Sequence, residues 1–338
     1  MQLDFHFYTI YTLCMLSGIK HEYSKKISYA SQHTDDAKYN HELEFVSGGR
    51  FQQQMSAHKF IDPRVFDNKT CYDIFLPFHF LSGVEGQEFY EMLLCRENSV
   101  TANELLNDTL RTLDKPYGLQ RLGVTLHVYA DTWSHQDFHG LNRDGNKIDY
   151  LDLLNTEKTF INEVVLGTSK LIPPLGHGQV YTYPDEPYLR WEYSKCNAEE
   201  HYKINNLDRF IDAAFHIFSF LANQVKEHTP VIFEKEPAKW NEIEDKFIEI
   251  FSIRESLEQR EIIWQRRISE GFFGFKSNIE YNDREWFYEA VEVKNKDLHI
   301  YDKKEKFQIS DWKYFHDALT LHKFYVKNEL LPKYGIIT

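Results

Sequence analysis

The sequence predicts a mainly α-helical fold with a small β hairpin or sheet in its C-terminal third. Four segments carry apolar residues at steps of three and four, a spacing that places them on one face of a helix: 103–113, 122–135, 208–228 and 240–268. Loops rich in Gly, Asn, Asp or Pro divide the helices near residues 46–70, 136–148 and 167–188. A final helix is expected over about residues 312–330.

The expected hairpin lies near residues 286–308. Residues 286–307, WFYEAVEVKNKDLHIYDKKEKF, alternate polar and apolar side chains, and Asn295, Lys296 and Asp297 provide a turn. Candidate metal ligands are dense only before residue 235, which predicts a helical metal-binding core over 1–235 and a helical extension over 236–338. The extension is either a separate unit or a set of extra helices packed as part of the same domain.

Composition narrows the class of protein. With 338 residues and 42% hydrophobic content, the chain can bury one large core or two smaller ones. The four cysteines, far apart and without a Cys-x-x-Cys pair, argue against a disulfide scaffold or a thiolate zinc site. No segment has the ~18 apolar residues of a membrane span, and the first residues lack a basic leader and a cleavage site. These features predict a cytoplasmic protein without a transmembrane segment.

The net charge limits the classes of molecule that the protein is expected to bind. The formal charge is −13 and the Lys and Arg residues are scattered among more numerous acids, so tight binding of duplex nucleic acid is not expected. Clustered cations would make one pocket attractive to a single phosphate on this acidic surface. The charge therefore favours a small or lipid-like phosphoester, and protein partners are not indicated.

The most informative motif is HVYADTWSHQDFH over residues 127–139, which places His127, Asp131, His135 and His139 at steps of four. On a helix each step turns the side chain by only about 40°, so neighbouring pairs share a face. Imidazole nitrogens and carboxylate oxygens suit zinc and similar divalent ions, and the central carboxylate can bridge two of them. Such a row also occurs on a solvated face of a helix, but the apolar neighbours here predict that the row is buried. Burial of four titratable side chains is unfavourable, and bound cations would offset that cost.

Further candidate ligands fall in four other segments. Each has a structural alternative, because a single His in an apolar segment is often a hydrogen-bonded core residue and an Asp pair often caps a helix. For His177, which Gly residues flank in a Pro- and Gly-punctuated loop, a loop residue bonded to backbone is an equal alternative. The candidates are Asp4, His6, Asp35, Asp36, His79, His177 and Asp185.

This order of residues resembles the zinc-dependent phospholipase C and P1 nuclease superfamily, whose helical enzymes carry a near-terminal ligand, an Asp, a His, a helix with His-x-x-x-Asp, and further His and acidic ligands. The added His four residues after the Asp looks most like the branch of glycosylphosphatidylinositol-specific phospholipase D. The segments Met-Gln-x-Asp-Phe-His, Thr-Asp-Asp, Pro-Phe-His-Phe and His-Val-Tyr-Ala-Asp-Thr resemble an uncharacterised bacterial family, chiefly over the first two hundred residues.

The resemblance implies a fold of phospholipase C/P1 nuclease type and a ligand set. Asp35 or Asp36, His79, His127 and Asp131 would hold one ion, His6 with Asp131 a second, and His135 a third. Secreted members use the amine of a processed Trp as a ligand. Since this chain opens with Met1-Gln2, Asp4 is the expected substitute.

The expected function is that of a metal-dependent phosphoesterase, phospholipase C-like or nuclease-like. Two or three divalent ions, zinc before manganese or iron, would activate water, with Asp131 as a bridge and Asp35 or Asp36 accepting a proton. The main alternative is a non-catalytic helical interaction module with a structural metal site. A smaller alternative rests on His316-Asp317, a pair found at the centre of the HD phosphohydrolases.

Overall fold

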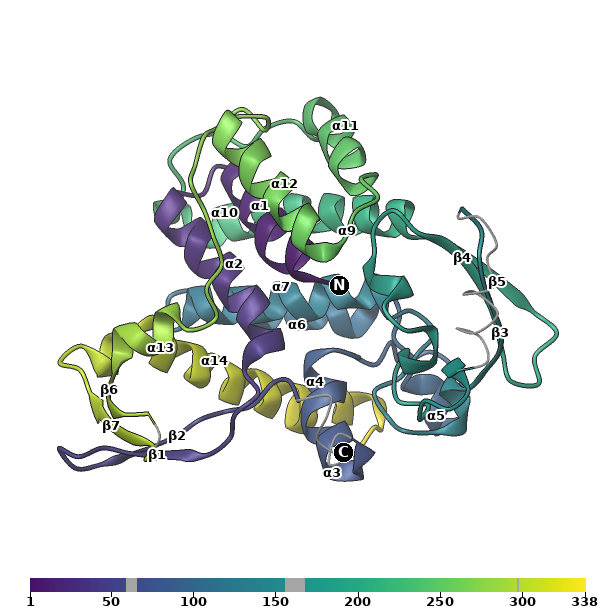
Figure 1. Cartoon of the computed structure of the whole chain (residues 1–338), viewed down its shortest axis with the longest axis horizontal. Helices are drawn as coiled ribbons and strands as arrows, with labels where there is room; N and C mark the ends of the chain where they lie inside the picture. Colours follow the sequence, from purple (N-terminus) through teal and green to yellow (C-terminus); the bar gives the residue numbers. More distant parts are fainter. Residues whose placement is uncertain (59–65, 156–167, 297) are drawn as a thin grey trace.

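One buried helix forms the centre of the molecule. The computed structural model describes residues 1–58, 66–155, 168–296 and 298–338. It is about 53% helical, so the predicted mainly α fold is confirmed. Helix α7 (Gly118–Ser134) runs through the middle of the molecule (Figure 1), and all of its residues except Leu119 are buried. A helix that is buried all round must satisfy any polar side chain from its neighbours.

Helices from both halves of the chain surround α7. Its neighbours are α2 (His21–Asp36), α6 (Val100–Leu110), α9 (Asn206–Phe220) and α14 (Asp311–Tyr325). The approach of α2 is especially close, because a Cβ added at Gly123 of α7 would lie 2.3 Å from the backbone oxygen of Ile27 and 2.6 Å from Cβ of Ala30. Glycine at this position therefore allows the middle of α2 to lie close against α7.

The N-terminal segment is also internal. The π-helical segment η1 (Asp4–Thr9) continues into α1 (Ile10–Leu16), and every residue of both is buried. In Figure 1 the N-terminus lies beside α7. This apolar segment therefore belongs to the core, and its polar residues are buried with it.

The predicted helical segments all contain helix, with shifted ends. Residues 103–113 correspond to α6, and 312–330 to α14 followed by η10 (Val326–Leu330). The segment 208–228 forms α9, η7 (Leu221–Val225) and α10 (Lys226–His228). The segment 240–268 divides into α11 (Trp240–Phe251) and α12 (Leu257–Glu270), because Ser256 caps α12 by accepting a hydrogen bond from the Gln259 amide.

The predicted hairpin is confirmed as β6 (Val291–Asn295) paired antiparallel with β7 (Ile300–Lys303); Asp297 of the expected turn lies outside the described residues. Two further sheets were not predicted. One pairs β1 (Glu42–Glu44) with β2 (Arg50–Gln52), and the other has the antiparallel order β3 (Ile148–Leu153), β4 (Arg190–Lys195), β5 (His201–Asn205).

Shorter helical segments connect these elements. They are α3 (Asn68–Thr70), η3 (Cys71–Phe75), α4 (Leu76–Phe78), α5 (Phe89–Met92), η4 (Asp144–Asn146), η5 (Gly178–Val180), η6 (Tyr183–Asp185), η8 (Pro230–Ile232), α13 (Glu285–Ala290), η9 (Phe307–Ile309) and η11 (Leu331–Tyr334). No helix in the described part of the chain is both long and apolar enough to cross a membrane.

A single large hydrophobic core joins the first residues to the last third of the chain. It runs from Met1 and Phe5 to Trp264, Leu331 and Ile336. The buried Arg260 of α12 donates from Nε to Asp4 Oδ2 at 2.7 Å, and so ties the extension to η1. A smaller cluster lies under the three-stranded sheet. Residues beyond 236 are thus packed as helices around the same core.

Candidate metal centre

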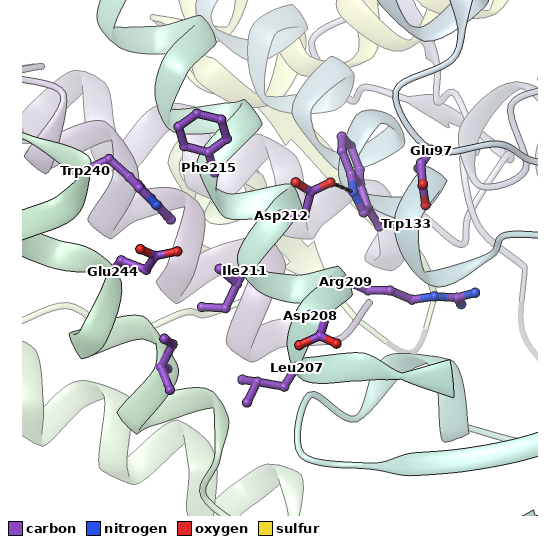
Figure 2. A pocket seen from close by; sticks show the side chains of 11 residues that line it. Glu97, Trp133, Leu207, Asp208, Arg209, Ile211, Asp212, Phe215, Trp240 and Glu244 are labelled. Atoms are coloured by element: carbon purple, nitrogen blue, oxygen red, sulfur yellow. Dashed lines mark hydrogen bonds between the residues drawn. The ribbon is translucent and has the colours of Figure 1, made fainter. Parts of the chain in front are cut away.

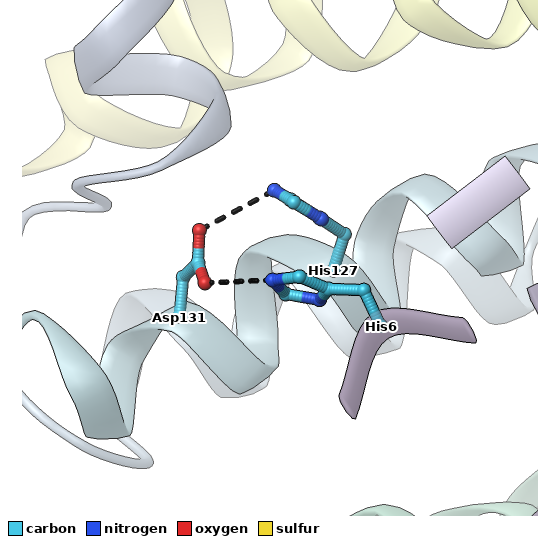
Figure 3. Close-up of side chains that lie close together, drawn as sticks. All are labelled: His6, His127 and Asp131. Atoms are coloured by element: carbon cyan, nitrogen blue, oxygen red, sulfur yellow. Dashed lines mark ion pairs between the residues drawn. The ribbon is translucent and has the colours of Figure 1, made fainter. Parts of the chain in front are cut away.

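The first group of candidate ligands consists of His6, His127 and Asp131 (Figure 3). His127 and Asp131 stand one turn apart on α7, and Asp131 Oδ2 lies 3.3 Å from His127 Nε2. His6 comes from η1, and its Nε2 lies 3.1 Å from Asp131 Oδ1. The imidazoles of His6 and His127 stack with centroids 3.9 Å apart. The two oxygens of Asp131 thus face histidines on different elements, as a bridging carboxylate requires.

A second group shares His127 and adds Asp35 from the end of α2 and His79 from just after α4. His79 Nδ1 lies 3.2 Å from His127 Nε2 and 3.3 Å from Asp131 Oδ2. Asp35 Oδ1 lies 3.7 Å from His79 Nδ1 and 3.8 Å from His127 Nε2. Nitrogen and oxygen atoms at these separations can all reach one ion at about 2.0–2.2 Å.

A third group combines His135, which follows α7, with His177 and Asp185. Asp185 Oδ1 lies 3.6 Å from His135 Nε2, and Asp185 Oδ2 lies 3.6 Å from His177 Nε2. The backbone nitrogen of Met1 connects this group to the first, because it lies 2.8 Å from Asp131 Oδ1 and 3.0 Å from Asp185 Oδ1. The three groups therefore form one continuous cluster, here called the ligand cluster.

Backbone carbonyls fix three of the imidazoles in the orientation of metal ligands. His79 Nε2 donates to the Ser56 oxygen at 2.9 Å, His135 Nδ1 to the His79 oxygen at 2.7 Å, and His177 Nδ1 to the Tyr181 oxygen at 2.9 Å. A carbonyl only accepts, so each of these nitrogens carries the hydrogen when the ring is neutral. The other ring nitrogen, unprotonated, then faces the ligand cluster. Metal-bound histidines are held in this way.

Several buried polar atoms of the ligand cluster have no hydrogen-bond partner. Within the described part of the chain, both ring nitrogens of His6, Nδ1 of His127 and Oδ1 of Asp185 are buried without a hydrogen-bond partner. His6 Nε2 approaches Asp131 Oδ1 closely but without hydrogen-bond geometry. A buried polar atom left unpaired costs about 1–3 kcal/mol. A divalent cation in the first group would give His6 Nε2 a partner, and one in the third group would do the same for Asp185 Oδ1, so the donor set fits a metal.

Electrostatics favour the protonation states that bind cations at four residues of the ligand cluster, but not at His79, where burial acts to lower the pKa and Asp131 and Asp35 outweigh it and raise the pKa. Burial lowers the pKa of His6 to about 4, with help from His127, and burial likewise lowers the pKa of His177 to about 4. For Asp131, burial acts to raise the pKa, but the Met1 amino group and the histidines outweigh burial and hold the pKa well below its usual value. The pKa of Asp185 is also lowered, against burial, by the Met1 amino group and His177.

Three predicted ligands lie outside the ligand cluster. Asp4 is two residues from His6 and so points to the opposite side of η1, where its carboxylate accepts from Arg260. Met1, rather than Asp4, faces Asp131 and Asp185. Asp36, next to Asp35, turns away and pairs with Lys38 at 3.1 Å, while Tyr281 donates to it at 2.9 Å.

His139 is the third predicted ligand outside the ligand cluster, because the helix that carries His127 and Asp131 ends before it. α7 ends at Ser134, and Asp137 takes a left-handed backbone conformation with φ 69° that turns the chain. His139 Nδ1 then contacts the Asn146 amide nitrogen at 3.2 Å and the Leu141 backbone nitrogen at 3.3 Å. Likewise His316 is buried away from the ligand cluster, and its Nδ1 accepts from the Gln54 amide.

Solvent reaches the ligand cluster at Asp35. A cavity of about 600 Å³ is bordered by Met1, Asp35, Asp36, Lys38 and Tyr281, with Glu280 and Asp283 at its edge. The Asp35 side chain is 32% exposed, whereas those of His6, His127 and Asp131 are at most 1% exposed. Any small molecule that enters from this cavity would meet Asp35 first.

Comparison with known proteins gives a family but no characterised relative. Residues 1–330 match the family described as "Family of unknown function (DUF6765)". No match was found among curated proteins or among solved structures.

Proposed function

The chain belongs to the DUF6765 family, and from this premise and the geometry of the ligand cluster we propose that it is a metal-dependent phosphoesterase. The observation that carries the proposal is the convergence of five histidines and three carboxylates, with three imidazoles oriented by backbone carbonyls. Their order along the chain resembles that of the phospholipase C and P1 nuclease superfamily, and we propose a fold of that type. Zinc suits these donors best, and manganese or iron are compatible with them.

Each side chain has a defined task in this proposal. His6, His79, His127, His135 and His177 would hold two or three divalent ions together with Asp35, Asp131 and Asp185. Ions held there would supply Lewis acidity to a phosphoryl oxygen and lower the pKa of a water molecule towards about 7. Asp131 would bridge two of the ions, since its two carboxylate oxygens face different groups of ligands.

Asp35 is the residue we assign to proton transfer. Of the three carboxylates in the ligand cluster, it is the one that borders the cavity, and its Oδ2 lies 4.0 Å from His6 Nε2. A carboxylate can accept the proton of an attacking water when it reaches that water directly. Asp36 is less suited, because Lys38 and Tyr281 hold it on the far side.

The cavity also limits the substrate. Asp36, Glu280 and Asp283 border it, against Lys38 as the one basic side chain among the lining residues of the described chain. A polyanion would be repelled there, whereas one phosphoester group can be attracted by cations in the ligand cluster. A small or lipid-like phosphodiester is therefore the proposed substrate class.

The first test is metal analysis with matched variants. Purified wild-type protein is expected to contain two or more divalent ions per chain by plasma mass spectrometry. Asp131→Asn and His79→Ala should each lose ions while helix content by circular dichroism is kept. Wild-type protein, but neither variant, should hydrolyse bis(4-nitrophenyl) phosphate. Full metal content in Asp131→Asn would contradict the assignment of Asp131 as the bridge.

A second candidate function is a structural metal site in a non-catalytic helical module. The burial of His6, His127 and Asp131 favours it, because a closed site needs no access. This candidate predicts metal without hydrolysis. Asp35→Asn separates the two functions, since it should abolish hydrolysis with most metal retained if the proposed phosphoesterase is correct. Wild-type protein that holds its full metal and hydrolyses no phosphodiester in a broad screen would support the structural candidate.

A further inference from the structure

A groove far from the cavity at Asp35 runs between α9 and α11 (Figure 2). Its volume is about 760 Å³. We call it the acidic groove and define it by its lining residues: Glu97, Trp133, Leu207, Asp208, Arg209, Ile211, Asp212, Phe215, Trp240, Glu244 and Ile248. None of these residues belongs to the ligand cluster, and the phosphoesterase proposal assigns none of them a role.

Two helices, α9 and α11, supply most of the side chains that line the acidic groove. Leu207, Ile211 and Phe215 stand one turn apart on α9. Trp240 and Ile248 stand two turns apart on α11, with Glu244 between them. Side chains at such spacing form ridges along each helix, against which a third helix can pack by ridge-into-groove packing. The ridges extend over about 12 Å, roughly two helical turns.

Apolar surface remains exposed in the acidic groove. Phe215 is 39% exposed and Ile248 is 38% exposed, and the rings of Phe215 and Trp240 pack with centroids 5.4 Å apart. Large apolar side chains grouped in a groove and rimmed by charges are typical of sites that bind another protein.

The rim is strongly acidic. Glu97, Asp208, Asp212 and Glu244 border the groove, and neither Asp208 nor Glu244 has a hydrogen-bond or ion-pair partner among the described residues. Arg209 points away from Glu244 and Trp240 in Figure 2, and its guanidinium lies against the Ser134 and Gln136 oxygens. The groove therefore presents unpaired negative charge around apolar surface.

One acid is held in place by the central helix. Trp133 of α7 donates from Nε1 to Asp212 Oδ2 at 2.7 Å (Figure 2). Trp133 is buried, so this bond orients the Asp212 carboxylate towards the groove at little further entropic cost. A pre-oriented carboxylate binds a cationic side chain more tightly than a mobile one.

From these observations we propose that the acidic groove binds a basic amphipathic helix of a partner protein. The apolar face of that helix would cover Ile211, Phe215 and Ile248. Its Lys or Arg side chains would pair with Asp208, Asp212 and Glu244. The occupant is a helix because apolar side chains repeat at helical steps along α9 and α11 and offer ridges for helix packing, and it is basic because of the charge of the rim.

The test measures binding of a designed helix to the full chain. The probe is a fluorescein-labelled, lactam-stapled peptide of about 18 residues with leucine along one face and lysine elsewhere, and the control probe has the same composition in scrambled order. At ~0.15 M salt, where long-range attraction is screened, the ordered peptide should bind at least about tenfold more tightly by fluorescence anisotropy.

Matched variants locate the site. Glu244→Lys and Phe215→Ala should each weaken binding of the ordered peptide at least about tenfold. Asp245→Lys makes the same charge change one residue along α11, and Phe324→Ala removes a ring of α14 that is more exposed than Phe215. Both should change binding less than about threefold. Equal weakening by Glu244→Lys and Asp245→Lys would overturn the proposal, as would equal binding of the scrambled peptide or no binding at all. Displacement of the peptide by equimolar spermidine would point instead to a small organic cation.

Discussion

At the residue scale, His139 shows that regular spacing in the sequence does not by itself place a residue in the ligand cluster. It continues the four-residue step of His127, Asp131 and His135 but lies beyond the end of α7, in contact with Asn146. His139→Ala is therefore expected to keep the full metal content and to lower the free energy of unfolding by about 1–3 kcal/mol, because buried hydrogen-bonding groups lose a partner. Metal analysis and urea denaturation of the variant measure both effects.

His177→Ala is the matched comparison for that variant. It removes a ligand of the third group, so it should lose about one ion per chain. If His139→Ala lost an ion and His177→Ala did not, the grouping of ligands described above would be wrong.

The residue types of the ligand cluster could be predicted from the sequence, but not the groups that orient their side chains. The His-x-x-x-Asp spacing on an apolar helix predicted His127 and Asp131, and a Gly-flanked position indicated His177. The oxygens that orient His79 and His177 belong to the backbone of Ser56 and Tyr181, where side-chain identity carries no signal. The choice between Asp35 and Asp36 depends on a rotation of about 100° that only the placement of α2 determines.

At the scale of elements, one carboxylate joins the N-terminal half to the last helix. Asp73 of η3 contacts Lys327 of η10 at 2.5 Å and Lys323 of α14 at 3.4 Å, besides Lys69 of the preceding helix α3. Burial acts to raise the pKa of Asp73, but the bonds from Lys327 and Lys69 outweigh it, and the pKa is lowered. A lowered pKa stabilises the fold above the pKa of the unfolded chain.

Asp73→Asn should therefore destabilise the protein most near neutral pH. We expect a loss of about 1 kcal/mol at pH 7, discounted for partial exposure. The difference from wild type should shrink as the pH falls below about 4, where the unfolded carboxyl is protonated and the stabilising charge is progressively lost. Urea denaturation across this range measures it, and a difference that grows on acidification would contradict the assigned sign.

Long helices were predictable and short elements were not. The amphipathic repeat over residues 240–268 indicated helix correctly, but the cap at Ser256 divides it into α11 and α12. Strands β1 and β2 have three residues each, too few for an alternating pattern to stand out. β3 and β4 pair although about forty residues separate them, and such long-range pairing leaves no local signal.

At the scale of the whole molecule, the ligand cluster connects distant parts of one chain. Its members come from η1, the end of α2, the residue after α4, the central helix α7 and the loop that carries His177 and Asp185. The same η1 is anchored from its other side by Arg260 of α12. A cation in the cluster would thus cross-link segments that are far apart in sequence and meet only in the folded state.

Metal removal should therefore destabilise the entire fold rather than one loop. Without a cation, both ring nitrogens of His6 stay buried without a hydrogen-bond partner among the described residues. A ligand present at a thousand times its dissociation constant adds about 4 kcal/mol to stability. For a chain of this size, that corresponds to a fall in Tm on the order of 10 °C after chelation. Calorimetry with and without chelator should show one cooperative transition in each case, and addition of zinc should restore the original Tm.

The variants give this experiment its controls. His139→Ala should respond to chelator as wild type does, because its metal content is unchanged. Asp131→Asn should melt at a lower temperature and show no response, since the bridge that binds the ions is lost. An unchanged Tm in wild-type protein from which all metal has demonstrably been removed would mean that the cluster does not cross-link the fold. In that case the buried carboxylates are compensated by the Met1 amino group, which lies within 3.0 Å of both, together with the surrounding histidines.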